Sequence, residues 1–457
     1  MSHIDQAFLQ DYFSKHYEEI LRTYTRFLSF PTISSDPSFS GQMSECAHWL
    51  QHFLQGIGAT VELWEEKGAP IVFASMRARN PDSPTILIYH HYDVQPTDPI
   101  EEWETSPFEA VEHEGVVRAR GASDNKGPCL TTLYVLAALA DRLPCHIKLL
   151  LDGEEESGSV SLERMISKKQ EQLQSDYTMV IDLGMDQENV PAVTLGCRGM
   201  VTMTMTVRGP KRDLHSGAAG GLIYNPLQAL VEMLASLRNA DGSIAVPGFY
   251  DGLVPMTEEE HRAVDFSFDE ERWKEEVGQS ATGGEQAFSP LERNWIRPTL
   301  EINGIHGGYG GCKVKTVIPR EAVAKLSCRL VPGQQPQEIG EKIARFLLDH
   351  KPEGVDLELT IHDGSGEAFR VPVHHGVRCL ERAMQLVWKT SAVRVLNGAS
   401  IPIIALLQKA TEGKLIPWGL SLLGDHIHSP NEQYDMQRIE RGFVTLALAI
   451  AFLGQSE

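Results

Sequence analysis

Two patterns of hydrophobic and polar positions follow one another along the chain, and each is typical of a different α/β structure. In the first pattern, the short apolar runs 85–89 and 146–151 predict buried strands, and residues 127–143 between them predict a helix. Apolar strands that alternate with helices are typical of a parallel sheet covered by helices on both faces. We therefore expect a mainly parallel sheet in the first part of the chain.

The second pattern begins near Val193. Residues 200–207 alternate Met or Val with Thr, which predicts a strand with one solvated face. Strand–helix–strand units then follow one another, as in a small two-layer α/β domain. The acidic stretch 256–276 predicts exposed helices inserted in this domain, and the first pattern resumes after Val373.

The predicted fold class is therefore α/β, with one domain split by another. We expect a mainly parallel-sheet domain formed by residues 1–195 and 398–457. The inserted two-layer α/β domain is expected over residues 196–397. A chain of 457 residues is long enough for two or three domains of ~150 residues each.

The charge balance narrows the classes of partner. The chain has 62 acidic and 41 basic residues, which gives a formal net charge of -21. A protein of this charge repels phosphate backbones and anionic membranes, so we expect neither nucleic acid nor a membrane as a partner. Seven scattered cysteines without a C-x-x-C pair, and no signal sequence at the start, predict reduced thiols in a cytoplasmic protein.

Residues that suit chemistry recur at the ends of predicted strands and at the start of a helix. Five segments contain carboxylates or imidazoles: His90-His91-Tyr92-Asp93, Asp124, Glu154-Glu155-Glu156, Asp182 and His426-Ile427-His428. In open α/β sheets ligands bind at the carboxyl ends of strands, so we expect these side chains to meet. Residues two apart share a face of a strand, so Asp93 could orient His91 as a metal ligand. The pattern by itself leaves His90 as a competing ligand.

The residue types indicate which metal ions could bind. Two histidines and about three carboxylates without a cysteine favour Zn²⁺, Mn²⁺ or Co²⁺. Two ions that share one carboxylate would lie ~3.5–4 Å apart. Of two adjacent glutamates after one strand, one can bind metal while its neighbour takes a proton from water. Each fragment also has a simpler interpretation, such as a hydrogen-bonded turn or a solvated helix start.

Eight segments between residues 89 and 432 together resemble the di-metal aminoacylase, carboxypeptidase and dipeptidase superfamily, and within it the cytosolic non-specific dipeptidase (carnosinase-type) branch. They are YHHYDVQP, ARGASDNKGP, DGEEESGS, DLHSG, KTVIP, CRLVP, NGASIP and HIHSPNE. The resemblance implies a metallopeptidase that hydrolyses the peptide bond of dipeptides. The alternatives are an N-acyl amino acid deacylase or an exopeptidase of the same superfamily and, more distantly, a non-catalytic metal-bound scaffold.

The resemblance also implies the residues of a two-metal centre. Two divalent ions, Zn²⁺ in preference to Mn²⁺ or Co²⁺, would be held by His91, Asp124, Asp182, Glu156 and His428. Asp124 would bridge the two ions, and a cis peptide bond would follow it. Glu155 would act as the general base, and Asp93 would orient His91.

For the inserted domain, the resemblance implies a lid that binds substrate and forms a homodimer. His215 would reach the active site of the partner subunit and help to stabilise the oxyanion; a surface histidine is the simpler alternative. Arg329 would clamp the terminal carboxylate of the substrate, because a planar guanidinium pairs with it bidentately; an ordinary salt bridge is the alternative. Thr316 and Ser400 would bind the same end of the substrate, and His362 would lie on the substrate side.

Overall fold

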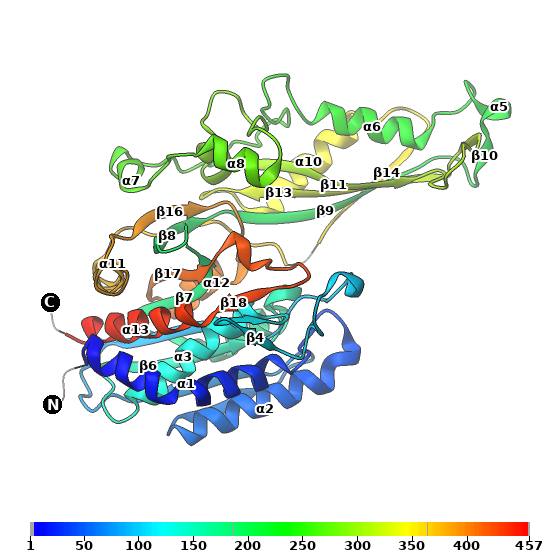
Figure 1. Cartoon of the computed structure of the whole chain (residues 1–457). Coiled ribbons are helices and arrows are strands. Elements are labelled where there is room, and N and C mark those ends of the chain that lie inside the picture. Colours follow the sequence, from blue (N-terminus) through cyan, green and yellow to red (C-terminus); the bar gives the residue numbers. More distant parts are fainter. Residues whose placement is uncertain (1–3, 186, 363, 456–457) are drawn as a thin grey trace. The chain divides into compact units, whose positions relative to one another are not determined.

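The computed structural model describes residues 4–185, 187–362 and 364–455, and the chain forms two compact units (Figure 1). The first unit contains Met1–Leu195, Val371–Val395 and Leu406–Glu457, and the second contains Gly196–Arg370 and Leu396–Ala405. The predicted inserted domain, 196–397, also included residues 371–395. The structure assigns that segment to the first unit, because α11 (His375–Trp388) packs against α13 (Met436–Leu453).

A mixed sheet forms the centre of the first unit. Its middle strands run parallel in the order β6 (His146–Asp152), β3 (Thr85–His91), β7 (Tyr177–Gly184) and β17 (Lys414–Ser421). Antiparallel pairs extend both edges: β2 (Ile71–Met76) and β1 (Thr60–Trp64) on one side, and β8 (Ala192–Cys197) on the other. The strand β8 also pairs with β16 (Val393–Asn397) and, antiparallel, with β15 (Phe369–Arg370), which belongs to the second unit. The predicted parallel strands therefore form the middle of the sheet.

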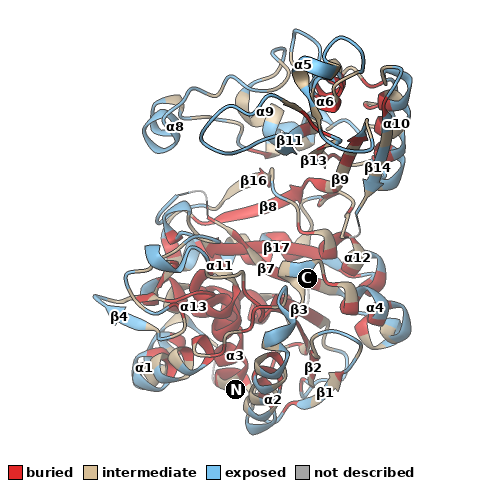
Figure 2. Ribbon diagram, turned by 90° about the vertical axis from the view of Figure 1, so that its right-hand side faces the viewer, coloured by how far each residue is buried: buried red, intermediate tan, exposed pale blue. Residues whose placement is uncertain are grey.

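Helices bury the parallel strands. The apolar helix α3 (Gly127–Leu139) packs against α13, α1 (Gln6–Leu28) and the strands β3 and β7, so nearly all of its side chains are buried (Figure 2). The helix α1 begins at Asp5, whose side chain accepts a hydrogen bond from the backbone N–H of Phe8 at 2.9 Å. The helices α2 (Ser40–Gly56) and α4 (Val160–Leu173) also belong to the first unit, whereas α12 (Pro402–Thr411) begins in the second unit and ends in the first.

A small antiparallel sheet joins two segments that are far apart in the sequence. Its order is β18 (Gln433–Asp435), β5 (Val116–Arg118) and β4 (Val111–His113). The backbone N–H of Ala119 then donates to the carbonyl oxygen of Glu432 at 3.0 Å. This pairing brings the segment before residue 433 beside the segment after residue 118.

The second unit is a two-layer α/β structure, as the sequence predicts. Its antiparallel sheet has the order β11 (Thr299–Gly307), β13 (Glu321–Leu330), β9 (Gly199–Arg208) and β14 (Asp356–Ile361). The helices α6 (Pro226–Ser236) and α10 (Pro336–Asp349) pack on one face of this sheet. Alternate β9 residues are buried in the core beneath them: Val201, Met203, Met205 and Val207. The intervening threonines lie on the opposite, more open face.

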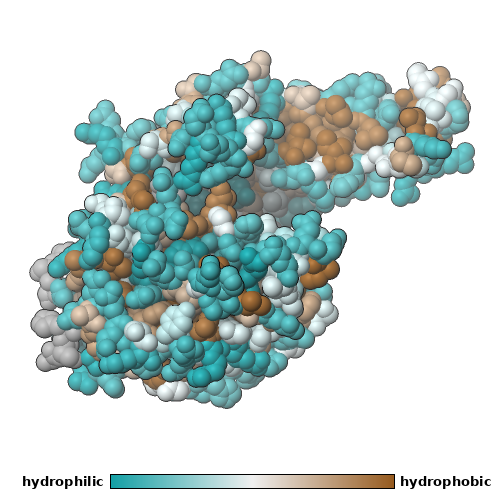
Figure 3. All heavy atoms as spheres, in the orientation of Figure 1, coloured by the Kyte–Doolittle hydropathy of each residue, from teal (hydrophilic) through white to brown (hydrophobic). Residues whose placement is uncertain are grey.

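Short elements complete the second unit. The strand β10 (Leu214–His215) pairs with β12 (Val317–Ile318) and leads into α5 (Ser216–Ala219). The acidic stretch forms α7 (Glu258–Ala263) and α8 (Glu270–Val277), neither of which has a buried residue, as predicted; α9 (Pro290–Trp295) follows. Figure 3 shows hydrophobic side chains gathered on this unit, at the upper right of the view.

Two further features concern the whole described chain. Within residues 4–455, apart from 186 and 363, no helix is both long and apolar enough to cross a membrane. All seven cysteines are among the described residues and none is in a disulfide; Cys312 is exposed and the other six are buried.

Candidate metal centre

The candidate site forms at the carboxyl ends of the parallel strands of the first unit. The strand β3 ends in His91, directly opposite Asp152 at the end of β6. On the other side of β3, strand β7 includes Asp182 near its own carboxyl end. Because these strands are parallel neighbours, the loops that follow them leave the sheet at the same edge.

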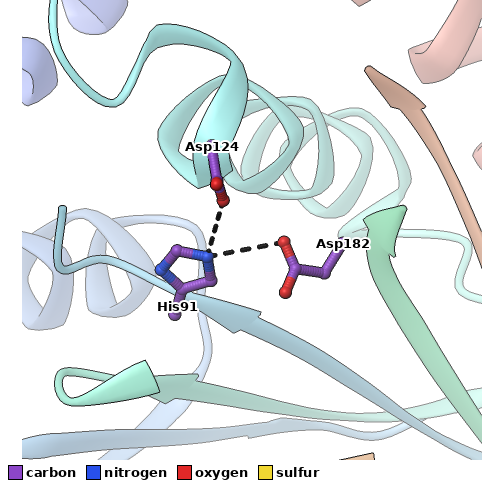
Figure 4. Close-up of side chains that lie close together, drawn as sticks. All are labelled: His91, Asp124 and Asp182. Atoms are coloured by element: carbon purple, nitrogen blue, oxygen red, sulfur yellow. Dashed lines mark hydrogen bonds and ion pairs between the residues drawn. The ribbon is translucent and has the colours of Figure 1, made fainter. Parts of the chain in front are cut away.

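Five predicted ligands lie in two groups that share one carboxylate. In the first group, Nε2 of His91 lies 3.0 Å from Oδ1 of Asp124 and 3.4 Å from Oδ1 of Asp182 (Figure 4). In the second group, Nε2 of His428 lies 3.0 Å from Oδ2 of Asp124 and 3.2 Å from Oε1 of Glu156. In each group one ligand atom per residue lies within 4.8 Å of the others, so each group could hold a cation.

The donor atoms of these groups fit two divalent cations. They are imidazole nitrogens and carboxylate oxygens, the ligands that Zn²⁺, Mn²⁺ and Co²⁺ accept. The buried Oε1 of Glu156 has no hydrogen-bond partner among the described residues, although it faces His428. A buried carboxylate oxygen without a donor is expensive, and a cation would satisfy it.

In both groups the carboxylates raise the pKa of the histidine, and the two histidines lower the pKa of the shared Asp124. Burial alone would lower the pKa of His91, but Asp182 and its neighbouring carboxylates raise that pKa well above the usual value. The hydrogen bond to Asp124 and the nearby carboxylate of Glu156 raise the pKa of His428 to about 10. Burial alone would raise the pKa of Asp124, but hydrogen bonds from the two histidines lower it below its usual value. The excess negative charge on the carboxylates therefore attracts positive charge to this position.

Asp93, which the resemblance places next to His91, lies against the other nitrogen of the His91 ring. Nδ1 of His91 is 3.1 Å from the backbone oxygen of Asp93 and 3.3 Å from its Oδ1. The buried carboxylate also accepts the backbone N–H groups of Glu155 at 3.2 Å and Glu156 at 3.0 Å, and the hydroxyl of Ser34 at 2.6 Å. Asp93 therefore fixes the histidine and the glutamate loop together.

Glu155, the predicted general base, begins the short 3₁₀ turn Glu155–Ser157 beside the two groups. Burial raises its pKa well above the usual value, and the opposing effect of His91 is too small to cancel the shift. A buried carboxylate with a raised pKa can accept a proton and hold it near neutral pH, which general acid–base catalysis requires.

Glu432 supports the site in a way that we did not predict from the sequence. Its buried carboxylate accepts the backbone N–H groups of Gly121 at 2.9 Å, Ser123 at 2.9 Å and Asp124 at 3.0 Å. It also accepts a hydrogen bond from the guanidinium of Arg120 at 2.8 Å. Arg120 lies in the motif ARGASDNKGP and Glu432 in the motif HIHSPNE, but 312 residues separate the two. Their pairing therefore could not be predicted from the spacing of residues along the sequence.

His90 joins neither ligand group. It is fully buried, and burial lowers its pKa to about 3, so the ring is neutral. Its ring nitrogens instead contact Asn125 and Thr132 at 2.7 Å each. The peptide bond between Asp124 and Asn125 is cis, as the resemblance implies. Of the two neighbouring histidines, only His91 lies in one of the two groups that could hold a cation.

The predicted substrate-binding residues lie in the second unit, in two places. His215 is exposed at β10, and the backbone oxygen of the neighbouring Thr316 accepts the N–H of Ser216 at 3.0 Å. Arg329 and Ser400 lie near the other end of β13, where the hydroxyl of Ser400 donates to the backbone oxygen of Gly199 at 2.9 Å.

The length of β13 separates these two places. The strand has ten residues, Glu321–Leu330, which span about 30 Å. Within one second unit, His215 and Thr316 therefore cannot contact the same substrate carboxylate as Arg329 and Ser400. His362 lies between them, with Nε2 2.6 Å from the hydroxyl of Thr204.

Comparison with known proteins shows which protein family the chain matches. Residues 87–451 match the model of peptidase family M20/M25/M40. The human Beta-Ala-His dipeptidase is 30% identical, over 92% of this chain and 87% of its own length. The Cys-Gly metallodipeptidase DUG1 of Candida albicans is 29% identical, over 94% of this chain and 93% of its own length. The structure of the M20 family metallo-carboxypeptidase Sso-CP2 from Sulfolobus solfataricus is similar with a TM-score of 0.87 at 30% identity, covering 95% of this chain and 99% of that one.

The contacts of Glu432 generate a stability prediction. Replacement of Glu432 by Gln removes the charge that pairs with buried Arg120 and turns an N–H toward other donors. We expect the free energy of unfolding of the first unit to fall by about 3–5 kcal/mol, measured by urea denaturation. The control Glu18→Gln changes an exposed glutamate of α1 and should shift the free energy of unfolding by less than about 0.5 kcal/mol. Equal stability of the two variants would contradict the role of Glu432.

Proposed function

The chain belongs to peptidase family M20/M25/M40, and we propose that it is a metal-dependent dipeptidase with a two-metal centre. The observation that carries the proposal is the shared carboxylate of Asp124, whose two oxygens face His91 and His428 at 3.0 Å each. The dipeptidase names of the human and Candida albicans relatives support dipeptides as the substrate class.

The proposed ligands are those of the two groups: His91, Asp124, Asp182, Glu156 and His428. Zn²⁺ is the preferred ion and Mn²⁺ and Co²⁺ are the alternatives, because all three accept nitrogen and oxygen donors. When bound, such ions supply Lewis acidity that polarises the scissile carbonyl and lowers the pKa of the attacking water toward ~7.

Glu155 moves the proton during the reaction. Its carboxylate takes a proton from the water that attacks the scissile carbonyl carbon, and then gives it to the leaving amine nitrogen. The raised pKa of this buried group lets it hold the proton between the two steps. Asp93 keeps the glutamate in place, because its carboxylate binds the backbone N–H of Glu155.

Arg329 binds the terminal carboxylate of the substrate, with Ser400 and His362 on the same unit. The guanidinium of Arg329 is half-buried, and among the described residues it makes no hydrogen bond or ion pair. A half-buried guanidinium without an acid partner favours a carboxylate ligand, which it can hold with two parallel hydrogen bonds.

His215 and Thr316 act on the substrate of a partner subunit. They lie together at the end of the sheet opposite Arg329, so one unit cannot bring all four side chains to one substrate. A homodimer could do so, with the imidazole of His215 stabilising the oxyanion and Thr316 donating a hydrogen bond to the substrate.

The edge of the second unit offers a surface for this homodimer. The edge strand β11 exposes Ile302 by 44% and Ile305 by 47%. Their cross-strand partners, Leu326 and Ala324, are buried under the helices, so the two isoleucines lie on the helix side of the sheet. Val231 of α6 is also exposed, by 53%. An unpaired edge strand with exposed apolar side chains favours association with a second copy.

A second candidate, carboxypeptidase activity on longer peptides, is favoured by the similarity to Sso-CP2. Removal of a C-terminal residue would use the same carboxylate recognition and the same proton transfer. The two activities differ only in the length of peptide accepted, so a panel of dipeptides, tripeptides and N-acetyl amino acids separates them and tests the deacylase alternative as well.

Replacement of Glu155 by Gln tests the reaction. The variant should bind the same number of metal ions as the wild type, because Glu155 is not a proposed ligand, and lose about 10²–10⁴-fold in kcat. The assay is hydrolysis of the panel by protein reloaded with Zn²⁺, Mn²⁺ or Co²⁺, and Glu163→Gln, an exposed glutamate of α4, is the control. Equal turnover by the two metal-loaded variants on every substrate would rule the mechanism out.

The role of Arg329 predicts that a free carboxylate is required. Amidation of the C-terminus of a dipeptide should lower kcat/KM at least ~100-fold, because the guanidinium is left without its partner. Arg329→Met should abolish this preference, Arg329→Lys should keep part of it, and Arg345→Met, an exposed arginine of α10, should leave it intact. An unchanged preference in Arg329→Met would show that another group reads the carboxylate.

Mixing two inactive variants tests action across the dimer. If His215 serves the partner subunit, heterodimers of Glu155→Gln and His215→Ala contain one intact site, so random mixing should restore about a quarter of wild-type activity. If His215 serves its own subunit, no activity returns. Introducing Ile305→Lys into both chains should yield monomers in analytical ultracentrifugation and abolish the recovery; dimers that persist would place the interface elsewhere.

A further inference from the structure

We propose that His90 is a positioning residue, which fixes the carboxylate of Asp182 through the amide of Asn125. The proposal rests on the proposed function in one respect, that Asp182 binds one of the two metal ions. It concerns a histidine that touches neither ligand group directly and that the proposed mechanism does not use.

The amide of Asn125 has a single satisfactory orientation. Its nitrogen donates to the backbone oxygen of Ile181 at 2.9 Å and to Oδ1 of Asp182 at 2.6 Å, which uses both of its hydrogens. The amide oxygen therefore faces away from Asp182 and lies 2.7 Å from Nδ1 of His90. In the flipped orientation, this oxygen would face two other acceptors in a buried place, which is costly.

The ring of His90 keeps the amide in this orientation. Because the oxygen of Asn125 can only accept, Nδ1 of His90 must carry the hydrogen. Nε2 of the neutral ring then accepts the hydroxyl hydrogen of Thr132, 2.7 Å away. His90, Asn125 and Thr132 are all fully or almost fully buried, so no water competes for these bonds. The donors form one directed chain that ends on Asp182.

The end of this chain lies in the first ligand group. Oδ1 of Asp182, which accepts from Asn125, is also 3.4 Å from Nε2 of His91 (Figure 4). The bond from Asn125 therefore sets the orientation of the carboxylate relative to His91. Adjacent residues of a strand point to opposite faces of the sheet. His91 belongs to the ligand group on one face of β3, and His90 supports that group from the other face.

Two substitutions of His90 separate its two nitrogens. The amide nitrogen of Asn is bonded to Cγ, as Nδ1 of His is, so His90→Asn can still donate to Asn125. The amide of Gln lies one bond further out, near the position of Nε2, so His90→Gln leaves the oxygen of Asn125 without its donor. Thr132→Val is the control, because it removes the partner of Nε2 and leaves the bond to Asn125.

The readout is metal binding by the full chain, measured by calorimetric titration with Zn²⁺ and by the visible absorption spectrum of the Co²⁺ form. We expect His90→Gln to weaken one of the two sites by about 10–100-fold and to change its Co²⁺ spectrum. In His90→Asn and Thr132→Val both sites should keep affinities within about threefold of wild type and unchanged spectra, because the bond to Asn125 remains.

The outcomes distinguish this inference from the proposed function. A wild-type protein that does not bind two ions would contradict the two-metal function itself. Wild-type affinities and spectra in a folded His90→Gln would overturn the role of His90 alone. If His90→Gln does not fold, the ¹⁵N spectrum of histidine-labelled wild type decides, since a hydrogen on Nδ1 of His90 supports the chain and a hydrogen on Nε2 overturns it.

Discussion

The division of one carboxylate between two histidines is the contact on which the site depends. Asp124 faces His91 with one oxygen and His428 with the other, although 304 residues separate Asp124 from His428. A largely buried carboxylate needs partners, and here the two partners come from segments on either side of the second unit in the sequence. The site can therefore form only when the two parts of the split first unit fold together.

Two buried acids that are not proposed ligands hold the loops around this contact. Asp93 binds the backbone of the glutamate loop and the ring of His91. Glu432 binds the backbone of the loop that contains Asp124. Each carboxylate accepts hydrogen bonds from backbone N–H groups that its loop would otherwise leave unsatisfied, so each acid helps to hold a loop that contains proposed ligands.

The sequence predicted those features that depend on local patterns. The strands predicted over 85–89 and 146–151 begin at the predicted residues, because their apolar runs mark the buried part of the sheet. The two-residue strands β10 and β12 are too short to show a period and were not predicted. The motifs brought the five proposed ligands to attention, and the structure brings them together.

What the sequence could not predict depends on contacts between distant segments. The bonds of His90 to Asn125 and Thr132 join two elements of the fold, and nothing in the local pattern signals them. The distance between Thr316 and Arg329 follows from the length and direction of β13, whereas the motifs alone assigned both residues to the same end of the substrate. The segment 371–395 joins the first unit because α11 packs against α13, a contact that periodicity does not reveal.

The order of the ligands along the chain has a consequence for biosynthesis. His91, Asp124, Glu156 and Asp182 all precede the second unit, and His428 follows it. On the ribosome, the first four of these residues therefore emerge before the second unit, whereas His428 and Glu432, which holds the loop of Asp124, emerge after it. Neither group has all of its contacts until the later segment folds back onto the earlier one.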